Sequence, residues 1–140
     1  MIAHVRRIHV SALAVAAVLA GCHSSERSGA CVPIGAATRV VVHVSLPRGT
    51  EILSDRIVTD PERIRELTGF ANARREASRP QLYTMPAPQM TAAFYDKADF
   101  LGSIGTGPNF FFVSCPNWNG VRRATDAEVR DFERLIGDAN

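Results

Sequence analysis

The sequence predicts an α+β domain, in which an antiparallel sheet carries two helices on one face in the order β-α-β-β-β-β-α. Three observations lead to this prediction. Residues 39–46 alternate apolar and polar side chains, which is typical of a half-buried strand. Helix-start signals at Asp60 and Thr125 are each followed by apolar residues at helical spacing. Short apolar runs separated by turn residues lie between the two helices and favour a two-layer sandwich.

The first strand and the first helix follow from local signals. The face of the strand 39–46 that we expect to be buried carries Val40, Val42, Val44 and Leu46. Residues 52–53 add a short extended piece. Asp60 can cap free amide groups, and Pro61 suits the first helical position because it has no N–H to leave unpaired. The apolar stripe of this helix is Ile64, Leu67, Phe70 and Ala71.

Between the two helices the sequence predicts a long loop and then four strands. Residues 79–89 contain Pro80, Pro86 and Pro88, so neither a helix nor a central strand persists there. The expected strands are 90–95, 100–104, 109–115 and 121–124, with the strongly apolar 109–115 in the middle of the sheet. The expected turns are 96–99, 105–108 and 116–120.

A capping box opens the second helix. Thr125 and Glu128 stand three residues apart, so each side chain can satisfy the backbone amide of the other. The buried stripe is predicted as Val129, Phe132, Leu135 and Ile136. Gly137 then ends the helix.

The chain before residue 38 divides into two parts. Residues 1–21 combine a basic start with the apolar run 8–20, which is shorter than the roughly 20 residues of a membrane span and fits a secretory signal peptide. Residues 22–37 are small and polar, so we predict a flexible tether. Residues 38–140 then form a single domain, because the 119 residues after the signal suffice for one hydrophobic core.

The apolar run closes on Leu19-Ala20-Gly21-Cys22. Small residues before a cysteine let the extended chain enter a peptidase while the thiol is presented for alkylation. This motif, placed directly after a basic and an apolar segment, resembles the lipobox of bacterial lipoproteins. The resemblance implies that Cys22 carries the lipid and anchors the protein to a membrane of the cell envelope. It further implies the outer membrane, facing the periplasm, because the next residue is His23 rather than Asp.

Once Cys22 is lipidated, Cys31 and Cys115 are the remaining thiols. An exported chain with two cysteines most simply joins them in a disulfide. A redox or metal role is the alternative. A redox pair, however, usually shows Cys-x-x-Cys, and a zinc site needs more ligands than this chain offers.

The chain after the signal is neutral. Arg6 and Arg7 are two of the 16 basic residues, which leaves 14 basic residues against 14 acidic ones. Because nucleic acids select for a strongly basic surface, this balance argues against a nucleic-acid partner.

The sequence offers no motif for catalysis, for a cofactor or for a metal. Only His23 and His43 follow the signal, and His43 lies in a predicted strand. There is no Gly-x-Ser-x-Gly, no His-Glu-x-x-His and no cluster of metal ligands. We therefore assign no catalytic, cofactor-binding or metal-binding residue.

Five residues are candidates for binding. Trp118, the single tryptophan, is predicted at a hairpin tip, where it either folds back on the sheet edge or projects as an anchor for a partner. Arg122 and Arg123 point to opposite faces, so at least one is exposed to meet an anionic group or to keep an edge strand from self-association. Tyr83 and Tyr95 are further contacts or core residues.

Two classes of function remain. The first is a lipid-anchored binding or adaptor module that holds an envelope protein, a cell-wall polymer or a small ligand near the membrane. The second is a small periplasmic enzyme whose acidic or hydroxyl residues converge only in the fold. The lack of catalytic motifs favours the first class.

Overall fold

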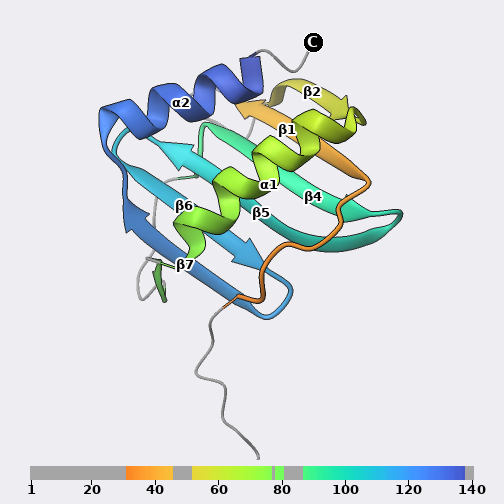
Figure 1. The fold of residues 1–140 in the computed structure, drawn as a ribbon. Helices are drawn as coiled ribbons and strands as arrows, with labels where there is room; N and C mark the ends of the chain where they lie inside the picture. Colours follow the sequence, from red (N-terminus) through yellow and green to blue (C-terminus); the bar gives the residue numbers. More distant parts are fainter. Residues whose placement is uncertain (1–30, 46–51, 77, 81–86, 138–140) are drawn as a thin grey trace, which may run out of the picture.

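A computed structural model of the chain describes residues 31–45, 52–76, 78–80 and 87–137 (Figure 1). The predicted signal peptide, the lipid-attachment residue Cys22, Leu46 at the end of the first predicted strand and the candidate contact Tyr83 lie outside these residues. What the sequence predicts for them therefore stays a prediction.

The described residues form one antiparallel sheet of seven strands in the order β2-β1-β4-β5-β6-β7-β3. The strands are β1 (Arg39–Ser45), β2 (Ile52–Val58), β3 (Arg79–Pro80), β4 (Met90–Asp96), β5 (Asp99–Gly107), β6 (Phe110–Cys115) and β7 (Trp118–Arg123). Two helices, α1 (Pro61–Arg75) and α2 (Asp126–Gly137), cover the same face of the sheet (Figure 1). The predicted fold class is confirmed.

The core lies between the sheet and the two helices. The ring of Phe111 on β6 meets the rings of Phe70 on α1 and Phe132 on α2 at centroid distances of 5.7 and 6.0 Å, and Phe70 stacks on Phe132 at 5.3 Å. The first two contacts hold both helices against β6, and the third joins the helices to each other. The other buried apolar side chains on this face of the sheet include Val40, Val42, Ala92, Phe94, Ile104 and Val113.

Both helix starts have the predicted chemistry. Asp60 accepts a hydrogen bond from the amide of Arg63 at 2.8 Å, and Pro61 is the first residue of α1. At α2 the amide of Thr125 donates to Glu128 at 3.0 Å, and the amide of Glu128 donates to the Thr125 hydroxyl at 3.3 Å. This reciprocal pair is a capping box.

The two strands that the sequence does not predict lie at the edges of the sheet. The short piece expected at residues 52–53 is the start of β2, which pairs with β1 over its length. The loop expected at 79–89 begins with the two-residue strand β3, where Pro80 is tolerated because an edge strand has one side without partners. The strand at 110–115 is consequently next to the middle strand, β5, and not in the middle itself.

The three turns are shorter than the sequence predicts, and in two of them glycines that the sequence places in the turn lie in a strand. Gly105 and Gly107 continue β5, so the reversal expected at 105–108 falls at 108–109. A Cβ on Gly105 would come within 2.7 Å of Pro88. The loop expected at 116–120 is a turn at 116–117, and Gly120 lies inside β7 beneath the indole of Trp118. The turn expected at 96–99 is confined to 97–98, since Asp96 pairs with Asp99.

Residues 31–37, which we call the N-terminal segment, pack against the domain although the sequence assigns them to the tether. Cys31 forms the expected disulfide with Cys115, with 5.7 Å between the Cα atoms. The side-chain amide of Asn72 accepts from the Ile34 amide at 2.9 Å and donates to the Ile34 carbonyl at 3.0 Å. Arg75 donates to the Cys31 carbonyl at 2.7 Å. Residues 31–37 are therefore part of the folded domain.

We expect the disulfide to be a large part of the stability. It joins residues 84 positions apart, and closing such a loop restricts the unfolded chain by about 4 kcal/mol. Replacing both Cys31 and Cys115 by Ser should lower the free energy of unfolding by that order, measured by urea denaturation against the oxidised wild type. Coincident unfolding midpoints for the two proteins would contradict this expectation.

Candidate functional site

The candidate binding residues divide between the two faces of the sheet. Trp118 and Arg122 lie on the face that carries the helices, because Trp118 is opposite Cys115 and Arg122 is opposite Phe111. Tyr95 and Arg123 lie on the opposite face. The structure thus does not bring the four described candidates together in one site.

Trp118 packs on the sheet. It is half-buried against the core at the first position of β7, and its indole covers Gly120 so closely that a Cβ there would overlap the ring. The indole Nε1 is buried and has no hydrogen-bond partner in the described part of the chain. Of the two arrangements open to this residue, the folded-back one is observed.

Arg122 belongs to a charged cluster that ties α1, β7 and α2 together. Its Nη2 donates to Glu128 at 2.6 Å, and the Nε of Arg74 lies 3.7 Å from the same carboxylate oxygen. The guanidinium of Arg74 in turn lies 3.3 Å from the centroid of the Phe70 ring. Both guanidinium groups face the same Glu128 carboxylate. We therefore interpret this cluster as a structural connection between the three elements.

The pKa shifts of the cluster have two different causes. The pKa of Glu128 is lowered, first by the hydrogen bond from the Thr125 amide and also by the bond from Arg122, with burial acting in the opposite direction. Burial lowers the pKa of Arg74, and the charge of Glu128 opposes that change. The carboxylate therefore stays ionised in the folded state to a lower pH than a free glutamate would.

An exposed patch lies on the sheet face opposite the helices, around Tyr95. It consists of Ile57, Val41, Arg39, Tyr95 and Phe100, which are neighbours across β2, β1, β4 and β5. The guanidinium of Arg39 lies 4.8 Å from the centroid of the Tyr95 ring, and Tyr95 meets Phe100 edge to face at 5.7 Å. Ile57 is 63% exposed and Phe100 is 36% exposed.

The exposed patch also contains an unpaired polar group. Nε of Arg39 is buried and has no hydrogen-bond partner in the described residues. Of this patch the sequence picks out Tyr95 alone. The alternation of 39–46 does place Arg39 and Val41 on the polar face, but the register that sets Ile57 and Phe100 beside them is not a local signal.

A second polar feature on the same face is a histidine–aspartate pair. Nδ1 of His43 lies 2.6 Å from the carboxylate of Asp55, with both side chains partly exposed. Thr91 is opposite His43 on β4, but its hydroxyl lies on the side of Gly105, 2.8 Å from the place of a Cβ there. The pair can orient a ring nitrogen as a general base, although the neighbouring hydroxyl does not face it.

Among the described residues, no group of three or more His, Cys, Asp and Glu side chains is placed to hold a metal ion. None of the helices in the described ranges has the length and apolar character to cross a membrane. Comparison of the chain with protein-family models, with curated proteins and with solved structures finds no match.

The lowered pKa of Glu128 predicts a pH dependence of stability. The ionised carboxylate stabilises the fold above its unfolded pKa near 4.5, and this contribution is lost as the pH falls through the lower folded pKa. Glu128→Gln should therefore lower the free energy of unfolding at about pH 6 and lose less further stability than the wild type on going to about pH 3.

Urea denaturation at the two pH values measures this difference. Glu133→Gln, which changes an exposed carboxylate on the same helix, is the control. Equal acid sensitivity of the wild type and Glu128→Gln would show that the capping carboxylate does not carry the effect.

Proposed function

We propose that this protein is a lipid-anchored binding module of the bacterial cell envelope, and that a partner protein docks on the exposed patch. The anchor rests on the lipobox that ends at Cys22. The binding role rests on one structural observation, the exposed patch, in which the exposed side chains of Ile57 and Phe100 lie beside Val41, Tyr95 and Arg39.

The N-terminal segment supports the anchor by setting how far the domain can stand from a membrane. Cys31 is fixed by its disulfide, so only the residues between Cys22 and Cys31 are left as the tether. Nine residue steps reach at most about 30 Å when fully extended. A domain held at this distance, on the periplasmic side of the outer membrane, meets partners that lie close to the membrane surface.

The composition of the exposed patch supports a protein partner. Exposed apolar groups such as Ile57 and Phe100 favour contact with another apolar surface, because burial removes their area from water. Tyrosine and arginine are enriched among the residues that carry binding energy. The guanidinium of Arg39 adds a positive charge beside the Tyr95 ring, so the partner that fits has an apolar segment beside a carboxylate.

A small periplasmic enzyme is the second candidate, and the His43–Asp55 pair is the observation that favours it. A histidine held by a carboxylate can accept a proton from water or from a substrate hydroxyl. The one described hydroxyl opposite it, on Thr91, is directed toward Gly105. Binding is consequently the function that the geometry supports better.

The lipid anchor predicts where the protein fractionates. Cys22→Ser removes the sulfur that would carry the acyl chains, and we expect this variant to move from the membrane fraction to the soluble fraction. Intact mass of the wild type should show the acyl increments and the loss of residues 1–21. A wild type without these increments would refute the anchor.

If a partner protein docks on the exposed patch, substitutions in the patch should weaken its binding. We expect Ile57→Ser combined with Phe100→Ser to lower the affinity at least about tenfold, because truncating an anchor side chain costs more than roughly 1 kcal/mol. The measurement is capture of the detergent-solubilised protein from envelopes, with quantitative mass spectrometry of the proteins that come with it.

Val32→Ser is the matched control, because Val32 is also an exposed aliphatic residue, 71% accessible, but lies in the N-terminal segment. Melting temperatures establish that all variants are folded. If the double variant and the control bring down the same partner in equal amount, the exposed patch is not the docking surface. Recovery of cell-wall polymer in place of a protein would show that the partner is a polymer and not a protein.

A further inference from the structure

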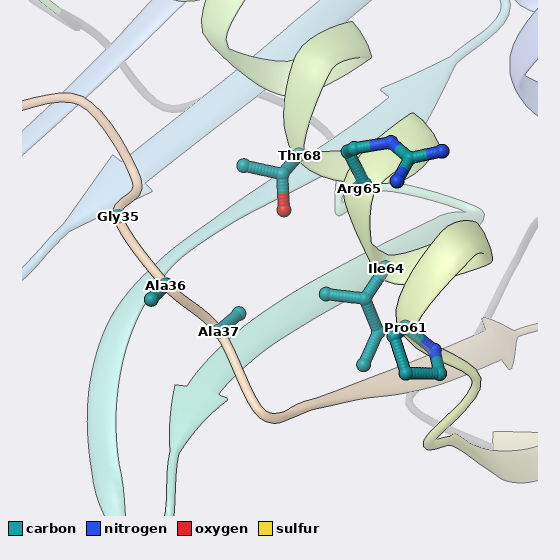
Figure 2. A pocket seen from close by; sticks show the side chains of 7 residues that line it. All are labelled: Gly35, Ala36, Ala37, Pro61, Ile64, Arg65 and Thr68. Atoms are coloured by element: carbon teal, nitrogen blue, oxygen red, sulfur yellow. The ribbon is translucent and has the colours of Figure 1, made fainter.

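An open pocket of about 210 Å³ lies between α1 and residues 35–37 (Figure 2). The pocket exists because the chain is held at Ile34 and at Thr38, and residues 35–37 between these two points stand away from α1. Ile34 is bonded to Asn72 on α1, and the Thr38 amide donates to the Tyr95 carbonyl at 2.8 Å. Between these points the Ala37 amide donates to the Gly35 carbonyl at 2.9 Å and turns the chain. The pocket is thus part of the folded domain.

The wall of the pocket on the side of α1 is apolar except for one hydroxyl. Ile64 is buried and Pro61 contributes its ring, and Ala37 faces them from the N-terminal segment (Figure 2). The Oγ1 of Thr68 is buried, has no hydrogen-bond partner in the described part of the chain, and points toward the space between the helix and residues 35–37. A threonine inside a helix often bonds the carbonyl four residues earlier, and Thr68 does not. A ligand atom that pairs with this hydroxyl would remove an unfavourable unpaired group.

One cation stands at the mouth. Arg65 lines the pocket through its aliphatic part, while its guanidinium points away from Thr68 (Figure 2). Its contact is an ion pair with Glu62 at 3.3 Å, in which the two side chains are 75% and 74% exposed. Such solvent-exposed pairs are weak, so the guanidinium is free to turn toward a bound anion. The described residues that line the pocket include no acidic side chain.

We propose that this pocket binds a short aliphatic carboxylate. The hydrocarbon part lies against Ile64, Pro61 and Ala37, and the carboxylate accepts hydrogen bonds from the Thr68 hydroxyl and from Arg65. The size of the ligand follows from the volume, which is below the range of about 300–1,000 Å³ that is common for drug-sized ligands. The site is on the helix side of the sheet, and its role is independent of a partner at the exposed patch.

The test is a titration of the full-length, isotope-labelled, detergent-solubilised protein with butyrate, followed by amide NMR shifts. We expect saturable shifts at residues 35–37 and 64–68, and a melting temperature that rises with butyrate concentration. Butyramide, which has the same body without the charge, should bind about tenfold more weakly.

Two variants and a control separate the ligand contacts from general effects. Thr68→Val keeps the shape and removes the unpaired hydroxyl, so we expect a protein at least as stable as the wild type that binds butyrate about tenfold more weakly. Arg65→Gln should weaken butyrate binding and leave butyramide binding unchanged. Arg130→Gln, which removes an exposed arginine from α2, should bind as the wild type does.

The proposal is overturned if butyrate produces no saturable shift at residues 35–37 and 64–68. It is equally overturned if Thr68→Val binds as tightly as the wild type, or if Arg130→Gln weakens binding as much as Arg65→Gln. None of these results depends on finding a partner for the exposed patch.

Discussion

The attachment of the N-terminal segment to the end of β6 and to α1 is the constraint on which the pocket and the start of the folded domain depend. The Cys31–Cys115 disulfide fixes its start, and the amide of Asn72 holds Ile34 as a neighbouring strand would. The pocket beside α1 exists because this segment is held at Ile34 and again at Thr38. If Cys22 carries the proposed lipid anchor, the same attachment limits the tether to the residues between Cys22 and Cys31 and so limits the distance between domain and membrane.

The two faces of the sheet differ in what covers them. One face buries its apolar side chains under α1 and α2, where the Phe70, Phe111 and Phe132 rings and the Glu128 cluster connect the layers. No helix of the described residues covers the other face, which carries the exposed patch. The two-layer sandwich thus buries its core on one side and leaves aromatic and charged groups accessible on the other, and the proposed binding role rests on the second side.

The parts of the fold that the sequence predicts are those with local signals. The alternation in β1, the Asp60 cap and the Thr125–Glu128 capping box each act within a few residues, and the structure confirms all three. The edge strands and the turn positions depend on contacts between distant residues. Their neighbours in the sequence place Gly105 and Gly120 in turns. In the structure both lie in strands, where the missing side chain leaves room for Pro88 and for the Trp118 indole. The exposed patch and the pocket depend on register and on the N-terminal segment, so the sequence reveals only Tyr95.

Amide hydrogen exchange at Ile34, in the oxidised full-length protein, tests the central claim most directly. The claim is that the N-terminal segment is a fixed part of the domain, with the Ile34 amide bonded to Asn72 at 2.9 Å. The account predicts protection of this amide comparable with the core strand β1, and selective loss of it in Asn72→Ala. Exchange of Ile34 at the rate of an unstructured peptide of the same sequence would contradict the account, and with it the short tether and the pocket.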